Sequence, residues 1–163
     1  MRKSLLFLFL IFAINGHAQL NHQWSFSTGD SLGVGWALDM RANSNGDVVI
    51  AGRAIDSLDL DTSASQQYID CDPGGNGFVA SYTAGGGFIW GFVFNSSSTL
   101  NTICADIELD ANGNIYVTGK FADTMDVDPG PAIYNLISQT GVDVFVASFT
   151  PNGILRWAFS YKN

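Results

Sequence analysis

Short apolar runs separated by turn sequences cover most of the chain, and they predict β-hairpins. The sequences Asn43–Gly46 and Asp110–Gly113 combine Asn or Asp with Gly, residues that adopt turn conformations readily. Each turn lies between two apolar runs of strand length, which is the pattern of a β-hairpin. We therefore expect one hairpin over 36–52 and its counterpart over 104–119.

A second pair of apolar runs follows each of these hairpins. In one unit it covers 78–92 around the turn Ala84–Gly86, and in the other it covers 145–159 around Pro151–Gly153. A longer Asp-rich connection joins the two hairpins of each unit. Each unit is therefore predicted to be one four-stranded antiparallel sheet.

The strands that leave the first turns are apolar on both of their faces. Val48–Ala51 and Ile115–Thr118 lack the clean alternation expected when one face of a sheet meets water. Both faces of each sheet should therefore be covered. Sheets of four strands stacked on one another are the blades of a β-propeller, so we predict an all-β chain with two four-stranded antiparallel propeller-type blades.

The two units are copies of one another at an offset of 67 residues. Aligning 36–92 with 103–159 without a gap gives 16 identities in 57 positions, against roughly four expected by chance. Self-similarity at a fixed spacing indicates a repeat architecture. We expect blades at 36–92 and 93–163, preceded by a linker and the tail strand of an earlier blade at 19–35. The tryptophans that recur at blade spacing, and should pack between blades, are Trp24, Trp90 and Trp157.

The first 18 residues have the pattern of a secretory signal peptide. Arg2 and Lys3 precede the apolar run Leu5–Ile14, which is too short to span a bilayer. Small residues place the expected cleavage after Ala18, so we predict a signal peptide over 1–18 and a secreted, extracellular protein. No later run of the sequence is long and apolar enough for a membrane span.

The charge balance after cleavage excludes two classes of partner. Seven basic residues less the two of the signal peptide leave five against 15 acidic residues, a net charge of −10. Nucleic acids and anionic membranes are bound by clustered Lys and Arg, so neither is expected as a partner. Export would permit a disulfide between Cys71 and Cys104, but they occupy different positions of the repeat, and two separate buried thiols are favoured.

The motifs of the second unit resemble the SBBP repeat, a family named for seven-bladed β-propellers. They are Trp90, Asp106, Asp110–Gly119 (DANGNIYVTG), Asp143–Val146 (DVFV) and Gly153–Trp157 (GILRW). The first unit departs from the pattern at Asn43, which replaces an Asp, and at Asn76-Gly77. The resemblance covers nearly all of 24–159 and implies an exported, mostly bacterial repeat protein, in a family mostly without assigned activity. Because a closed propeller has roughly four to eight blades, two units predict a fragment of a longer product or a ring of copies.

Side chains for nucleophilic or zinc chemistry are scarce. His17 would leave with the signal peptide, so His22 is the one histidine available to a catalytic triad or a zinc site. Clustered carboxylates recur in both units and could bind calcium, although the EF-hand pattern is absent and a turn-forming role is favoured. The candidate metal ligands are Asp59, Asp61, Asp126 and Asp128. A glycosidase acid–base pair is the other interpretation, and duplication disfavours it because a catalytic site is needed once.

These patterns predict a structural, adhesive or ligand-binding protein without a catalytic site of its own. The expected partner is a protein or a polysaccharide outside the cytoplasm, or another copy bound through the blade faces. Trp36 is an additional sugar-stacking candidate, since its repeat position holds Ile103 rather than a second aromatic residue. The alternative function is that of a fragment of a longer glycan-active propeller enzyme.

Overall fold

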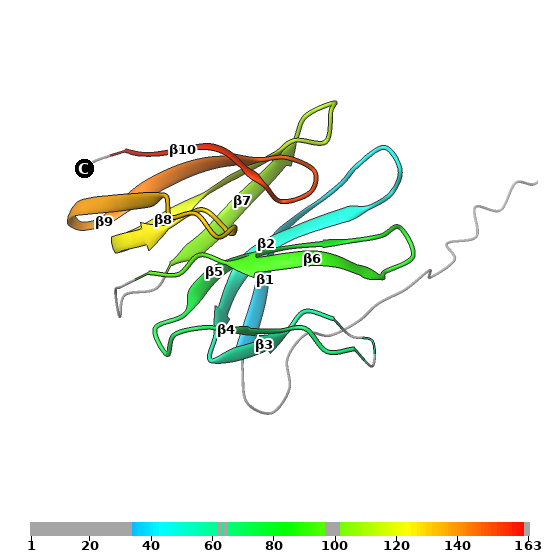
Figure 1. Cartoon of the computed structure of the whole chain (residues 1–163), viewed down its shortest axis with the longest axis horizontal. Helices are drawn as coiled ribbons and strands as arrows, with labels where there is room; N and C mark the ends of the chain where they lie inside the picture. The colour runs from blue at the N-terminus through cyan, green and yellow to red at the C-terminus, as the bar shows by residue number, and fades with distance from the viewer. Residues whose placement is uncertain (1–33, 62, 64, 97–101, 162–163) are drawn as a thin grey trace, which may run out of the picture.

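The computed structural model describes residues 34–61, 63, 65–96 and 102–161, which form an all-β molecule of antiparallel strands (Figure 1). The predicted signal peptide, Trp24 and His22 lie outside the described residues. In the part of the chain that is described, no helix is both long and apolar enough to cross a membrane.

The first four-stranded sheet has the strand order β1-β2-β5-β6. Its strands are β1 (Val34–Ala42), β2 (Val48–Ile55), β5 (Asn76–Tyr82) and β6 (Phe88–Val93). The two hairpin turns close where the sequence predicts them. Gly46 and Gly86 take φ values of +86° and +85° there, a conformation that glycine adopts without strain.

The second sheet has the same order of strands, β7-β8-β9-β10. Its strands are β7 (Ile103–Leu109), β8 (Ile115–Asp126), β9 (Asn135–Phe149) and β10 (Leu155–Tyr161). The pairing register is also the same after a shift of 67 residues. Trp36 pairs with Arg53 as Ile103 pairs with Lys120, and the same holds across the middle and outer strand pairs. The two predicted four-stranded antiparallel sheets are therefore present, and they are copies in register as well as in sequence.

The Asp-rich connections contain more strand than the sequence pattern predicts. In the first unit, β3 (Ser57–Asp59) and β4 (Tyr68–Asp70) pair as a separate hairpin. In the second unit the equivalent residues extend β8 and β9, so that Met125 pairs with Leu136. The predicted strand ends at Gly52 and Gly119 were too early. The reason is that apolar residues between the aspartates bury themselves against the sheet, as Leu58 and Leu60 do.

The second sheet lies over one face of the first, and the β3–β4 hairpin lies on the opposite side (Figure 1). We call the side that faces the second sheet the forward face of the first sheet. It carries Val49, Ala51 and Val79, which belong to the core that the two sheets share. The opposite side, the rear face, carries Phe78 and Tyr82 and packs on the hairpin. The forward face and the part of the rear face around β5 are covered in this way, whereas Met40 on the β1 side of the rear face is 57% exposed, so the prediction of two covered faces holds only in part.

The second sheet meets the first with its own rear face. Phe145 and Phe149, the repeat counterparts of Phe78 and Tyr82, contact Phe92 and Phe94 of the first unit, with ring centroids 5.3–6.0 Å apart. The forward face of the second sheet points away from the first, and Tyr161 on it is 62% exposed. The prediction that both faces of each sheet are covered was therefore wrong for this face.

The two cysteines form no disulfide with each other, in agreement with the favoured interpretation. Cys104 is fully buried and Cys71 is half-buried. Burial raises the pKa of the Cys71 thiol to about 11 and holds that of Cys104 well above its usual range. Both are therefore protonated, unreactive thiols at neutral pH.

Candidate functional site

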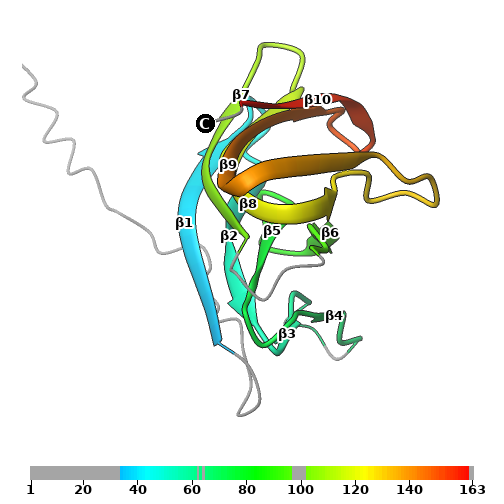
Figure 2. The same cartoon turned by 90° about the vertical axis from the view of Figure 1, so that its left-hand side faces the viewer.

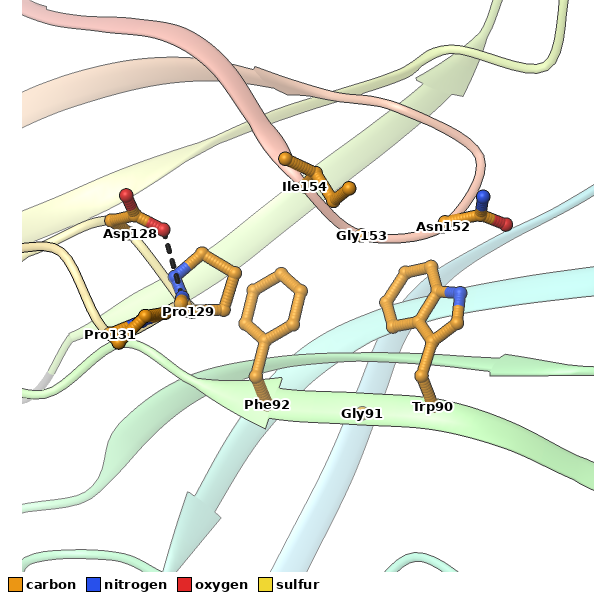
Figure 3. Close-up of a pocket in the computed structure, with 10 residues that line it drawn as sticks. Trp90, Gly91, Phe92, Asp128, Pro129, Pro131, Asn152, Gly153 and Ile154 are labelled. Carbon is orange, nitrogen blue, oxygen red and sulfur yellow. Dashed lines mark hydrogen bonds between the residues drawn. The ribbon is translucent and has the colours of Figure 1, made fainter.

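A groove of about 510 Å³ lies at the outer edge of the boundary between the two sheets (Figure 3). Three segments enclose it: the middle of β6, the loop at 128–131 and the turn at 152–154. The side chains that line it are Trp90, Phe92, Asp128, Pro129, Pro131, Asn152 and Ile154. The groove therefore exists only because the two sheets are stacked, since each contributes one wall.

The aromatic wall of the groove is fixed by contacts across the boundary. The Trp90 and Phe92 rings are stacked, with centroids 5.6 Å apart and planes inclined by 10°. The Trp90 indole donates from Nε1 to the Pro151 carbonyl oxygen at 3.1 Å. A Cβ atom at Gly153 would lie 3.3 Å from the same indole, so glycine allows the turn to approach it closely. Trp90 thus packs between the sheets as predicted.

The polar wall is organised by the repeated aspartates. Asp128 Oδ1 accepts from the backbone N–H of Gly130 at 2.8 Å and is fixed beside Pro129 (Figure 3). Asp126 Oδ1 accepts from the N–H groups of Asp128 and Tyr134 at 3.1 and 3.0 Å. These bonds hold the loop in shape, which is the role that short acidic side chains play in turns.

The aspartates of the first unit make the same bonds. Asp59 Oδ1 accepts from the N–H groups of Asp61 and Gln67 at 3.0 and 2.8 Å, and Asp61 Oδ1 accepts from that of Ser63 at 2.9 Å. Within the described residues, no group of three or more His, Cys, Asp or Glu side chains is placed to hold a metal ion. The observed contacts of Asp59, Asp61, Asp126 and Asp128 are thus those of turn residues, and calcium binding stays a prediction.

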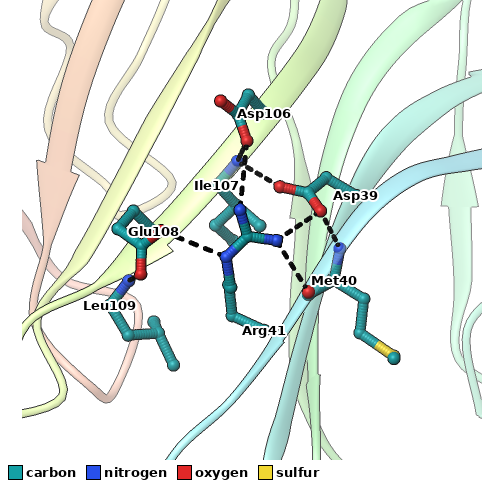
Figure 4. A network of polar contacts seen from close by, with 7 residues as sticks. All are labelled: Asp39, Met40, Arg41, Asp106, Ile107, Glu108 and Leu109. Carbon is teal, nitrogen blue, oxygen red and sulfur yellow. Dashed lines mark hydrogen bonds and ion pairs between the residues drawn. The ribbon is translucent and has the colours of Figure 1, made fainter.

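A charged cluster joins the edge strands β1 and β7, which lie side by side (Figures 2 and 4). We call these two strands the inner strands. Arg41 pairs with Glu108 at 3.1 Å and with Asp106 at 3.6 Å, and it also bonds its neighbour Asp39. Asp39 in turn accepts from the backbone N–H of Ile107 at 3.1 Å. One guanidinium therefore connects the two units.

The carboxyl groups of this cluster are electrostatically coupled. A hydrogen bond with Asp106 is the main reason that the pKa of Asp39 falls to about 2, and the same bond raises the pKa of Asp106. The Arg41 guanidinium lowers the pKa of Glu108. This cluster was not predicted from the sequence. In the sequence, Arg41 and Glu108 occupy the same position of the two repeat units and carry opposite charges. Only the stacking of the units shows that their side chains meet.

Of the other two described tryptophans, Trp157 differs from its predicted packing role, whereas sugar stacking by Trp36 stays a prediction. The guanidinium of Arg53 lies 5.3 Å from the centre of the Trp36 ring and occupies one of its faces, which limits Trp36 as a sugar-stacking platform. Trp157 is 38% exposed and does not pack between the two sheets, because it lies on the forward face of the second sheet.

No protein-family model matches the chain, and no curated protein matches its sequence. The resemblance to the SBBP repeat therefore stays a prediction from the motifs. The groove and the faces of the two sheets are the features that bear on function.

Proposed function

We propose that the chain is an exported, propeller-type repeat protein that binds polysaccharide and has no catalytic site of its own. The groove beside Trp90 carries this proposal. Its volume of about 510 Å³ is in the range of ligand sites, roughly 300–1,000 Å³, and its lining is aromatic with a few polar groups.

The stacking of the sheets supports the propeller-type arrangement. The forward face of one four-stranded sheet packs on the rear face of its copy, so the contact can be repeated by further copies. The edge strands β1 and β7 are adjacent, and β6 and β10 form the opposite edges of the two sheets. Blades arranged around an axis have this geometry.

The chemistry of the groove suits a sugar chain. Sugar rings present apolar C–H faces that pack on aromatic rings, and the stacked rings of Trp90 and Phe92 form an extended aromatic wall. Sugar hydroxyls need hydrogen-bond partners, which the Asn152 amide and the Asp128 carboxylate at the groove can supply. An open groove also admits a polymer, which an enclosed cavity would exclude.

The repeated aspartates support a binding function over catalysis. Glycoside hydrolysis uses two carboxyl groups on either side of one bond, with different environments. Asp59 and Asp126 instead make the same backbone hydrogen bonds in the two units. A role that recurs with the repeat is structural.

Affinity electrophoresis of the full chain through gels containing neutral and acidic polysaccharides tests this proposal. Ile154 is 64% exposed at the groove, and Ile133 is 76% exposed on the β8–β9 loop, outside its lining. We expect retardation by at least one polysaccharide, which Ile154→Asp reduces on the order of fivefold, equivalent to about 1 kcal/mol, and Ile133→Asp leaves unchanged. Retardation by none of the polymers, or release of reducing ends from the retarding polymer, would overturn the proposal.

A further inference from the structure

The forward face of the second sheet repeats the face that the first sheet buries. In the first unit, Trp90 and Phe92 pack against the shared core and Phe94 is 1% exposed within it. Their counterparts 67 residues later are Trp157, Phe159 and Tyr161, which are 38%, 41% and 62% exposed. The same aromatic stripe is therefore buried or half-buried in one unit and open in the other.

Strand pairing places these aromatic residues on one surface. Trp157, Phe159 and Tyr161 pair with Ser148, Val146 and Val144, and paired residues of antiparallel strands share a face. Val144 is 48% exposed beside them. The stripe lies on β10, at the end of the stack away from the first sheet (Figure 1). A contiguous exposed apolar face of this kind indicates an interaction surface.

The first sheet has an open surface on its rear face, which is the face that the second sheet uses to receive the aromatic stripe of the first. On the rear face of the second sheet, Ile107 and Val117 are each 1% exposed because the first sheet covers them. The repeat counterpart of Ile107 is Met40, which is 57% exposed on the rear face of the first sheet. Its strand neighbour Ile50 is only half-buried. The inner half of this rear face, formed by β1 and β2, is therefore open, whereas the equivalent half of the second sheet is covered.

The charges at the inner strands also match. Inside the chain, Arg41 of the first unit pairs with Glu108 of the second at 3.1 Å. Arg41 and Glu108 occupy the same position of the two repeat units. If the same packing formed between two copies, Glu108 of one copy would therefore face Arg41 of the next copy. The pair would again be of opposite charge, because the two repeat positions carry Arg and Glu.

From this equivalence we propose that a second copy of the chain docks head to tail. The forward face of the second sheet in one copy packs on the rear face of the first sheet in the next copy, where Met40 and Ile50 are accessible. Such an interface joins two different surfaces, so it extends into a closed ring or an open filament rather than stopping at a symmetric dimer. This inference does not depend on the ligand of the groove.

Light scattering on a sizing column, with the full chain and single variants, tests the docking. The wild type should have a mass of several chains. Phe159→Glu charges the exposed stripe and Met40→Glu charges the receiving surface, so each variant alone should have the mass of one chain. Ile133→Glu, at a 76% exposed position of the β8–β9 loop, is the control and should keep the wild-type mass.

Mixing the two variants distinguishes head-to-tail docking from a symmetric contact. Phe159→Glu keeps an intact receiving surface and Met40→Glu keeps an intact stripe, so an equimolar mixture should double in mass to a dimer. That result would also show that both variants are folded. A monomeric wild type, a Met40→Glu variant that keeps the wild-type mass, or a mixture that stays monomeric would each overturn the proposal.

Discussion

Phe94 and Tyr161 occupy the same position of the two repeat units, but their exposure differs far more than the change from Phe to Tyr would suggest. Phe94 is 1% exposed and contacts three aromatic rings, whereas Tyr161 is 62% exposed. Both follow the same pattern of Trp and Phe along the outer strand. The burial of this stripe therefore depends on a neighbouring sheet, not on the sheet that carries it.

The largest expected effect comes from truncating Phe94, with the same truncation at Tyr161 as the comparison. Phe94→Ala should lower the free energy of unfolding by about 3–5 kcal/mol, since it opens a cavity between the sheets. Tyr161→Ala should change it by less than roughly 0.5 kcal/mol in the dissociated chain, because an exposed ring loses little contact area. Urea unfolding at low protein concentration measures both values, and similar losses would show that the stacking is wrong.

A smaller and symmetric effect is expected at the repeated aspartates. Asp59→Ala and Asp126→Ala each remove an acceptor of two backbone hydrogen bonds, so each should lower the free energy of unfolding by about 1–2 kcal/mol. Asp→Asn at either position keeps an oxygen acceptor and is the matched control. Chelator should leave the unfolding midpoint of the wild type unchanged, whereas a fall in the midpoint would assign these residues to a metal site instead.

The smallest effect concerns the charged cluster that joins the units. The pKa of Asp39 is lowered from 3.8 to about 2, so its stabilising contribution is complete above pH 3.8 and is lost as the pH falls toward 2. Asp106→Ala should move the pKa of Asp39 back toward 3.8, because the bond with Asp106 is the main cause of the shift. Carboxyl titration by NMR measures this, and a wild-type Asp39 that titrates near 3.8 would contradict the cluster.

Local patterns predicted the hairpins well because turn chemistry is short-range. The glycine at each Asn-Gly turn and the apolar runs beside it fix where the chain reverses, and the registers follow. The strand extension at Met125 was missed because isolated apolar residues among aspartates resemble a loop. They become strand only when Leu136 pairs with them across the sheet.

The site could be predicted only in part. Trp90 was identified as a packing residue from its spacing, but the groove beside it needs the loop at 128–131 from the other sheet. The exposure of Trp157 could not be predicted, since its sequence context matches that of Trp90. The contact of Arg41 with Glu108 joins residues 67 positions apart, and only the stacking of the two copies brings them together.

Hydroxyl-radical footprinting over a series of protein concentrations tests the account most directly. At the lowest concentration, where copies are separate, Phe159 and Tyr161 should be labelled strongly while Phe94 stays protected. As the concentration rises, labelling of Phe159 and Tyr161 should fall toward that of Phe94, because a second copy covers them. Equal labelling of Phe94 and Tyr161 at the lowest concentration would contradict the claim that the same face is buried in one unit and open in the other.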